Sequence, residues 1–82
     1  MKQQQQACLI PIAFGTEELE AVTVIDVLRR AKIRVIVCKV NSDDDENKDS
    51  LIVKCSRGTK IVCDMHLSDA LKLDYNSIAL PG

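Results

Sequence analysis

The chain has 82 residues, enough for one small domain, and hydrophobic residues make up 46% of it, which favours a packed core over a disordered chain. A formal net charge of -1 and an aromatic content of 2% argue against a nucleic-acid-binding surface, because such surfaces are usually basic and often stack bases on aromatic rings. Nothing indicates a membrane partner, and no apolar stretch is long enough to span a bilayer.

Residues 1–6 are polar and rich in glutamine, and we expect a disordered tail there. They lack the charged start and the long apolar stretch of a signal peptide, so a cytoplasmic protein is expected. The four cysteines are widely spaced and three of them lie in apolar runs, which favours buried, reduced thiols in a reducing compartment. The sequence has no closely spaced cysteine pair of the kind that binds zinc, and we predict neither a metal nor a cofactor.

The first half of the chain predicts a strand, a helix and a second strand. A near-continuous apolar run over residues 7–14 is typical of a strand buried on both faces, although Pro11 donates no hydrogen bond to a neighbouring strand. We expect the helix over residues 17–31, followed by a β-branched strand over residues 33–40. Such a unit makes the two strands parallel and the connection right-handed.

The second half is less regular. The acidic residues 41–50 predict a solvated, mobile loop, and the alternative of a calcium site lacks the EF-hand pattern. Later segments predict a hairpin, a short helix and a last short strand before the Pro81-Gly82 turn, over residues 51–55 with 60–63, 67–73 and 77–80. This order indicates a doubly wound parallel α/β sheet that is incomplete, because such sheets usually have about five strands or more.

The predicted helix carries a carboxylate in an unexpected place. We expect Thr16 as its N-cap and Lys32 at its end, where glycine is more usual. On a helical wheel Glu20 falls inside the apolar arc, which is made up of Ala21, Val24, Ile25, Val27, Leu28 and Ala31. Either Glu20 reaches solvent or a backbone N–H near the helix start, or it is a functional carboxylate at the carboxyl end of the first strand. Leu19 and Val22 form a second apolar patch, for another subunit or another part of the domain.

Several motifs resemble one known family. The loop Gly15-Thr16-Glu17-Glu18-Leu19-Glu20 and the helix after it resemble the first loop and helix of the ThiJ/PfpI superfamily, most closely its parkinsonism-associated deglycase (DJ-type) branch. Further matches follow in the order of that branch, at Cys55-Ser56-Arg57, Asp64, Leu67, Asp69-Ala70 and Leu80-Pro81-Gly82. The resemblance runs from Ala7 to Gly82. It implies a flavodoxin-like fold, usually dimeric, of which residues 1–82 are the N-terminal part of a single domain.

The resemblance also implies site residues. In that family a glutamate of the first helix hydrogen-bonds a nucleophilic cysteine, and by resemblance Glu20 is this glutamate. Gly82 matches the first glycine of a Leu-Pro-Gly-Gly turn that binds an oxyanion or a substrate oxygen. The family's cysteine and its usual histidine lie downstream of that turn, so we expect this chain alone to be inactive. Cys55 resembles a family cysteine near the dimer interface, whereas no role carries over to Cys63.

The implied function is that of a glyoxalase or protein deglycase acting on α-oxoaldehydes or glycated substrates, with the missing C-terminal half and a second subunit as partners. The alternative is a redox-sensing chaperone of the same fold, oxidised at its cysteine. A third reading, from the chain length alone, is a self-contained binding module. The chain departs from the family at Lys32 and in the acidic loop around Asp43, which has the character of an insertion.

Overall fold

A computed structural model describes residues 5–82, so most of the tail expected over residues 1–6 lies outside the described residues. Four parallel strands form the central sheet in the order β5-β2-β1-β6, with bounds β1 Ala7–Ile12, β2 Arg34–Lys39, β5 Met65–His66 and β6 Ser77–Ile78. The pairing of β1 with β2 is continuous from Ala7 opposite Arg34 to Ile12 opposite Lys39 and passes through Pro11 without a bulge. The predicted parallel α/β fold is therefore confirmed.

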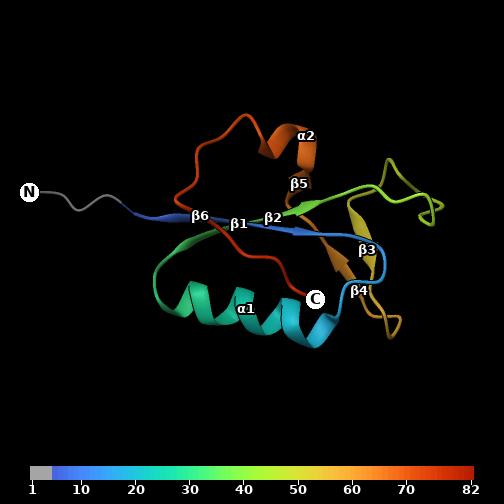
Figure 1. The fold of residues 1–82 in the computed structure, drawn as a ribbon, viewed down its shortest axis with the longest axis horizontal. Coiled ribbons are helices and arrows are strands. Elements are labelled where there is room, and N and C mark those ends of the chain that lie inside the picture. Colours follow the sequence, from blue (N-terminus) through green and yellow to red (C-terminus); the bar gives the residue numbers. More distant parts are fainter. Residues whose placement is uncertain (1–4) are drawn as a thin grey trace, which may run out of the picture.

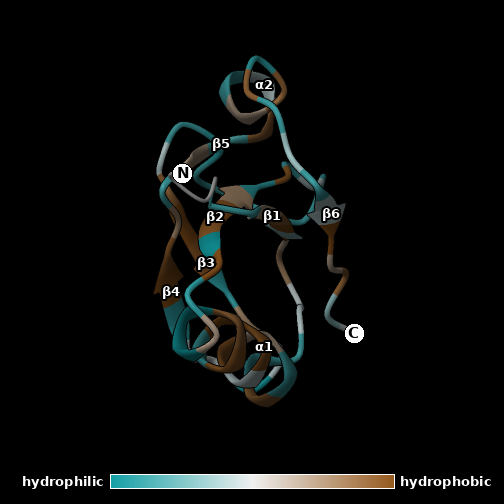
Figure 2. Cartoon of the chain, turned by 90° about the vertical axis from the view of Figure 1, so that its left-hand side faces the viewer, coloured by the Kyte–Doolittle hydropathy of each residue, from teal (hydrophilic) through white to brown (hydrophobic). Residues whose placement is uncertain are grey.

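Two helices lie on opposite faces of this sheet. The long helix α1, Glu18–Arg30, covers one face, and the short helix α2, Leu67–Ala70, lies on the other (Figures 1 and 2). The predicted hairpin is a separate two-stranded antiparallel sheet of β3, Ile52–Lys54, and β4, Lys60–Val62. The hairpin lies beside α1 on the same side of the main sheet (Figure 2).

The two faces of the sheet are packed unequally. The larger core cluster joins β1 and β2 to α1 and the hairpin, and its buried members are Cys8, Ile10, Ile12, Ala21, Val35, Val37, Val53, Cys55 and Cys63. The smaller cluster on the α2 side contains Leu9, Ile36, Cys38 and Ala70. All four cysteines are buried and free, as the sequence predicts. Burial of apolar area is the dominant favourable contribution to folding, so the α1 side contributes most of the stability.

The ends of α1 differ from the prediction. Glu17 is the N-cap, because its carboxylate accepts a hydrogen bond from the Leu19 N–H, while the expected cap Thr16 accepts one from the Ala13 N–H instead. The helix ends at Arg30 with Ala31 as its C-cap. Lys32 then adopts a φ of 66°, the left-handed conformation for which glycine is the usual residue.

The predicted apolar arc of α1 is partly wrong. Ala21 is buried and Val24, Ile25 and Leu28 pack against the larger cluster, but Val27 is 56% exposed and Ala31 is also exposed. The helix lies over a narrow sheet, so only part of its apolar surface finds a partner within residues 5–82. Leu19 and Val22, the second predicted patch, are 72% and 52% exposed.

Two features of the second half were not predicted. The strand β5 has only two residues and pairs with the end of β2. The acidic loop is not wholly solvated, because it folds around the buried side chain of Lys39. The Lys39 ammonium donates to Asp45 Oδ2 at 2.7 Å, the Ser50 carbonyl at 2.7 Å and the Asn47 carbonyl at 2.9 Å, which satisfies all three of its donors.

No helix within residues 5–82 is long and apolar enough to cross a bilayer.

Candidate functional site

The order of the strands identifies the carboxyl ends of β1 and β6 as the place for a site. From β1 the chain passes through α1 to β2 on one side, while β6 pairs with β1 on the other side. The direction of winding therefore reverses between β1 and β6. Open α/β sheets bind their ligands outside the carboxyl ends of strands at such a switch point. The segments that follow these two strands are residues 13–17 and 79–82.

Gly82 lies against the start of α1, and Figure 1 shows the C-terminal end beside the N-terminal turn of that helix. The Glu17 N–H donates a hydrogen bond of 2.7 Å to the Gly82 carbonyl oxygen. A Cβ atom built on Gly82 would lie only 2.5 Å from Glu20 Oε2, so the two predicted site residues are adjacent. The structure thus brings together Glu20 and Gly82, which are 62 positions apart in the sequence.

The carboxylate of Glu20 is not used to hold the fold together. Glu20 is exposed, and among residues 5–82 its carboxylate has no hydrogen-bond or ion-pair partner. Glu20 is open to solvent near the start of the helix. The same position leaves the carboxylate free for a ligand or for another protein group at the switch point.

Glu18, two residues earlier, is hydrogen-bonded to the hairpin turn through both of its carboxylate oxygens. Its carboxylate accepts hydrogen bonds from the Arg57 N–H at 3.0 Å, the Thr59 N–H at 3.3 Å and the Ser56 hydroxyl at 2.9 Å. The Ser56 hydroxyl also lies 3.1 Å from Glu17 Oε2, so its single proton is shared between two carboxylates. These contacts form a clamp, by which we mean Glu17 and Glu18 bound to the hairpin turn Ser56–Thr59.

Two backbone hydrogen bonds strengthen the clamp. The Ser56 N–H donates to the Thr16 carbonyl at 2.9 Å, and the Gly15 N–H donates to the Lys54 carbonyl at 3.0 Å. Hydrogen bonds from the backbone N–H of Glu18 itself, from the Ser56 hydroxyl and from Thr59 lower the pKa of the Glu18 carboxyl from 4.5 to about 2, although desolvation opposes the shift. Glu18 is therefore ionised at any ordinary pH, and the helix N-terminus favours this charge.

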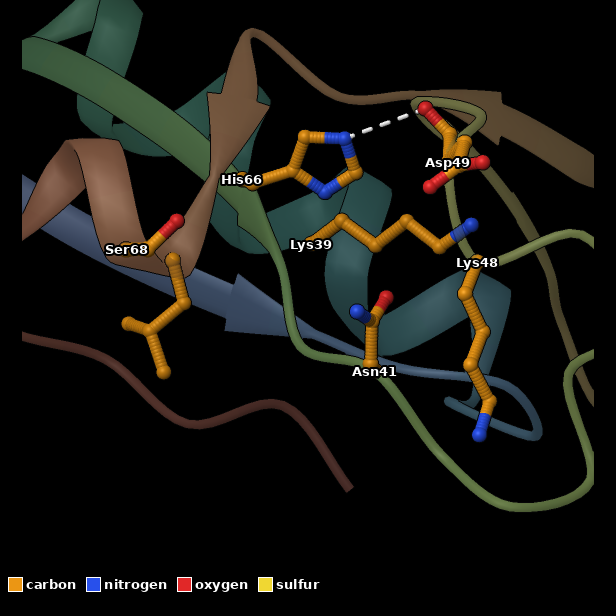
Figure 3. A pocket seen from close by; sticks show the side chains of 7 residues that line it. Lys39, Asn41, Lys48, Asp49, His66 and Ser68 are labelled. Carbon is orange, nitrogen blue, oxygen red and sulfur yellow. Dashed lines mark hydrogen bonds between the residues drawn. The ribbon is translucent and has the colours of Figure 1, made fainter.

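A hollow with a volume of about 380 Å³ lies at the carboxyl ends of β2 and β5. Figure 3 shows His66, Ser68 and Asn41 around it, with Lys48 and Asp49 from the acidic loop. The His66 ring nitrogen Nε2 lies 3.2 Å from the Asp49 carbonyl oxygen, and since a carbonyl only accepts, Nε2 carries the proton. Within residues 5–82 no group of three or more His, Cys, Asp or Glu side chains is arranged to hold a metal ion.

The cysteines have the environment of structural thiols. Burial raises the pKa of the Cys38 thiol, and burial followed by the charges of Glu18 and Glu17 raises that of Cys55. Burial, with smaller contributions from Cys38 and Asp64, raises the pKa of Cys63 to about 12. Because the thiolate is the nucleophilic form, these three thiols are poor nucleophiles near neutral pH.

Sequence reasoning singled out Glu20 and Gly82, which the structure places side by side, but it did not predict the clamp or the contacts of Lys39. The clamp joins positions about 40 apart, and no local pattern marks Ser56 as a partner of Glu18. In the sequence the motif Cys55-Ser56-Arg57 carries a resemblance to the family, but nothing in it indicates a physical role for Ser56. A lysine at the end of a β-branched strand, followed by an acidic loop, was the one available signal for the Lys39–Asp45 pair.

Comparisons with known proteins agree on one family. The model of the DJ-1/PfpI family matches residues 6–82. The chain is 47% identical to Protein DJ-1 homolog B of Arabidopsis thaliana over 74 residues, covering 90% of this chain and 15% of that protein. It is similar in structure to oxidized Toxoplasma gondii DJ-1, with a TM-score of 0.81 and 38% identity over 94% of this chain and 38% of that one. For Drosophila melanogaster DJ-1beta the TM-score is 0.83 and the identity 34%, over 96% of this chain and 39% of that one.

Proposed function

Because this chain belongs to the DJ-1/PfpI family, we propose that it supplies the carboxylate side of a cysteine-dependent site that converts α-oxoaldehydes. The chain spans less than two fifths of the length of the relatives described above. The proposal therefore includes a C-terminal part that carries the nucleophilic cysteine, so that residues 1–82 form the N-terminal part of one domain. We call this chain together with that part the complete domain.

One observation carries the proposal. A glutamate without a partner among residues 5–82 lies against a glycine at the switch point of a parallel sheet. Glu20 is in the first turn of α1, where the helix dipole attracts negative charge. Gly82, without a side chain, lets the backbone come close to a ligand and to Glu20 at the same time. In the proposal Glu20 is the proton-transfer group and the backbone at Gly82 helps to bind the substrate oxygen.

The chemistry balances for methylglyoxal and water giving lactate. The thiolate adds to the aldehyde carbon and forms a hemithioacetal, whose oxygen takes up a proton. Glu20 then removes the proton from that carbon and returns it to the neighbouring carbon, while the hydroxyl proton passes from the oxygen of the first carbon to the oxygen of the second. These two proton transfers turn the hemithioacetal into a lactoyl thioester. Water hydrolyses the thioester, releasing lactate and regenerating the thiol. No external oxidant, reductant, metal or cofactor is needed for these steps.

The assembly and location belong to the same proposal. Leu19, Val22 and Val27 on the outer surface of α1 are more than half exposed, and a second copy of the domain would cover such apolar area in a homodimer. Four buried, free thiols suit a reducing compartment such as the cytoplasm.

The test is lactate formation from methylglyoxal by the complete domain. Glu20→Gln keeps the size of the side chain and removes its ability to take up a proton, so we expect kcat to fall roughly 100-fold or more. Asp26→Asn removes an exposed carboxylate from the same helix and serves as the matched control, with no expected change in rate. Equal rates for Glu20→Gln and the unmodified domain would rule out the proposed role.

The redox-sensing chaperone is the second candidate, and a related structure favours it, since the Toxoplasma gondii DJ-1 is described as oxidized. In this case Glu20 would hydrogen-bond an oxidised cysteine rather than transfer protons. Peroxide-dependent sulfinate formation, measured by intact mass, without lactate formation would favour the sensor. Turnover of methylglyoxal that Glu20→Gln abolishes would favour the enzyme.

A further inference from the structure

We propose that Glu18 and Ser56 are positioning residues, which set the geometry of Glu20 and Gly82 by clamping the first turn of α1 to the hairpin turn. This inference rests on the proposed function of Glu20 and assigns new roles to two residues that do not touch Gly82 themselves. Its structural part, the coupling between the hairpin turn and Gly82, is measurable without any activity.

A continuous chain of contacts connects the two places. The Ser56 hydroxyl and the Arg57 and Thr59 N–H groups hold the Glu18 carboxylate. The same hydroxyl reaches the carboxylate of Glu17, whose backbone N–H donates to the Gly82 carbonyl. The helix start is thus bound to the hairpin on one side and to the end of the β6 segment on the other.

The clamp has the properties of a rigid support. Its acceptor is an ionised carboxylate, and hydrogen bonds to charged groups are stronger and shorter than those between neutral groups. The hairpin behind it is anchored in the core through Val53, Cys55 and Cys63, each at most 4% exposed. A catalytic group must be held within a fraction of an ångström of its productive position, and rigid neighbours provide this precision.

The coupling is tested first by amide hydrogen exchange in the complete domain. Ser56→Ala and Glu18→Gln should each lower the protection of the Glu17 N–H by roughly 10-fold, because a charged hydrogen-bonding network is lost. Ser56→Thr, which keeps the hydroxyl, should restore the protection. Ser68→Ala, which removes an exposed hydroxyl from α2, should leave it unchanged. Unchanged protection of Glu17 in both clamp variants would overturn the inference, whatever the activity of the domain.

The effect on function is tested by a double-mutant cycle at a temperature where all variants are folded. Glu18→Gln should lower kcat by about 10-fold with little change in KM, because a small misplacement of a catalytic group slows chemistry more than binding. In a Glu20→Gln background the same substitution should cost nothing further, since its effect passes through Glu20. A full additional loss in that background would mean that Glu18 affects the rate independently of Glu20, and would contradict the positioning role.

A domain that does not turn over methylglyoxal still distinguishes the two proposals. The rate of peroxide oxidation of the cysteine then replaces kcat in the cycle. Loss of Glu17 protection in the clamp variants together with absent turnover would reject the proposed enzyme and retain the coupling. Turnover by the unmodified domain with intact Glu17 protection in the clamp variants would retain the enzyme and reject the coupling.

Discussion

The first turn of α1 has two sides that use the same kind of side chain differently. Glu18 and Glu20 are two residues apart, which places them roughly 200° apart around the helix. Towards the hairpin, both carboxylate oxygens of Glu18 accept hydrogen bonds, and the pKa of this carboxyl is about 2. Towards Gly82, Glu20 is exposed and has no partner among residues 5–82. A carboxylate saturated by its own fold supports the architecture, whereas an unsaturated one at a switch point is available for chemistry.

Asp45 extends this comparison, because it is a second carboxylate that the fold itself uses. One of its oxygens binds the Lys39 ammonium and the other accepts a hydrogen bond from the Asn47 N–H. Lys39→Met should lower the free energy of unfolding by about 3 kcal/mol, since it removes the buried ammonium and leaves the little-exposed Asp45 carboxylate and two loop carbonyls without their donor. Urea denaturation of the complete domain measures this effect. Lys72→Met removes an exposed ion pair with Asp69 and should change the stability by less than about 1 kcal/mol.

Gly82→Ala tests the open side with a single methyl group. The new Cβ would lie 2.5 Å from Glu20 Oε2, so the flexible Glu20 side chain has to move. We expect kcat for methylglyoxal to fall by about 10- to 100-fold, because displacement of a reacting group by about 1 Å has an effect of that size. The melting temperature should hardly change, since the contact involves only the exposed end of a side chain. A large loss of melting temperature with full activity would assign the open side to the architecture.

The clamped side predicts a particular pH dependence. The folded-state pKa of Glu18 is lowered from 4.5 to about 2, so its contribution to stability is complete above pH 4.5 and is lost as the pH falls towards 2. Melting temperatures measured between pH 7 and pH 2 should therefore decline less steeply for Glu18→Gln than for the unmodified domain. Asp26→Asn is the control and should follow the unmodified curve. Parallel curves for Glu18→Gln and the unmodified domain would show that Glu18 is not specially stabilised.

The smallest expected effect concerns the core thiols beneath the hairpin. The pKa of Cys63 is raised to about 12, chiefly by burial, so this thiol is almost wholly protonated at pH 8. Alkylation by iodoacetamide, followed by peptide mass spectrometry, should label Cys63 only after denaturation. Rapid labelling in the folded domain would indicate that the hairpin opens readily and that the clamp does not hold it.

The sequence predicted the repetitive parts of this fold and missed what depends on contacts between distant residues. The strand–helix–strand unit and the hairpin were visible because β-branched runs and helical periodicity are local signals. The two-residue strand β5 has no periodicity of its own and exists only because the end of β2 offers a partner. The exposure of Val27 depends on how much of α1 the sheet covers. A helical wheel shows only the directions of side chains around the helix and gives no information on the width of the sheet.

The candidate site divides in the same way. Glu20 was predicted as a site residue because a carboxylate within an apolar arc conflicts with its surroundings, and Gly82 because it matches a family motif. Ser56 carries no such conflict, since an exposed serine in a turn is ordinary. Its significance comes from the 2.9 Å contact with Glu18, which required the hairpin to be placed beside α1.

The most direct measurement of the difference between the two sides compares melting temperature and kcat for Glu20→Gln in the complete domain. We predict a melting temperature within about 2 °C of the unmodified domain, since the Glu20 side chain holds no contact of the fold among residues 5–82, together with a loss of kcat of roughly 100-fold. A clear fall in melting temperature with an unchanged kcat would contradict this, since it would make Glu20 part of the architecture, as Glu18 is.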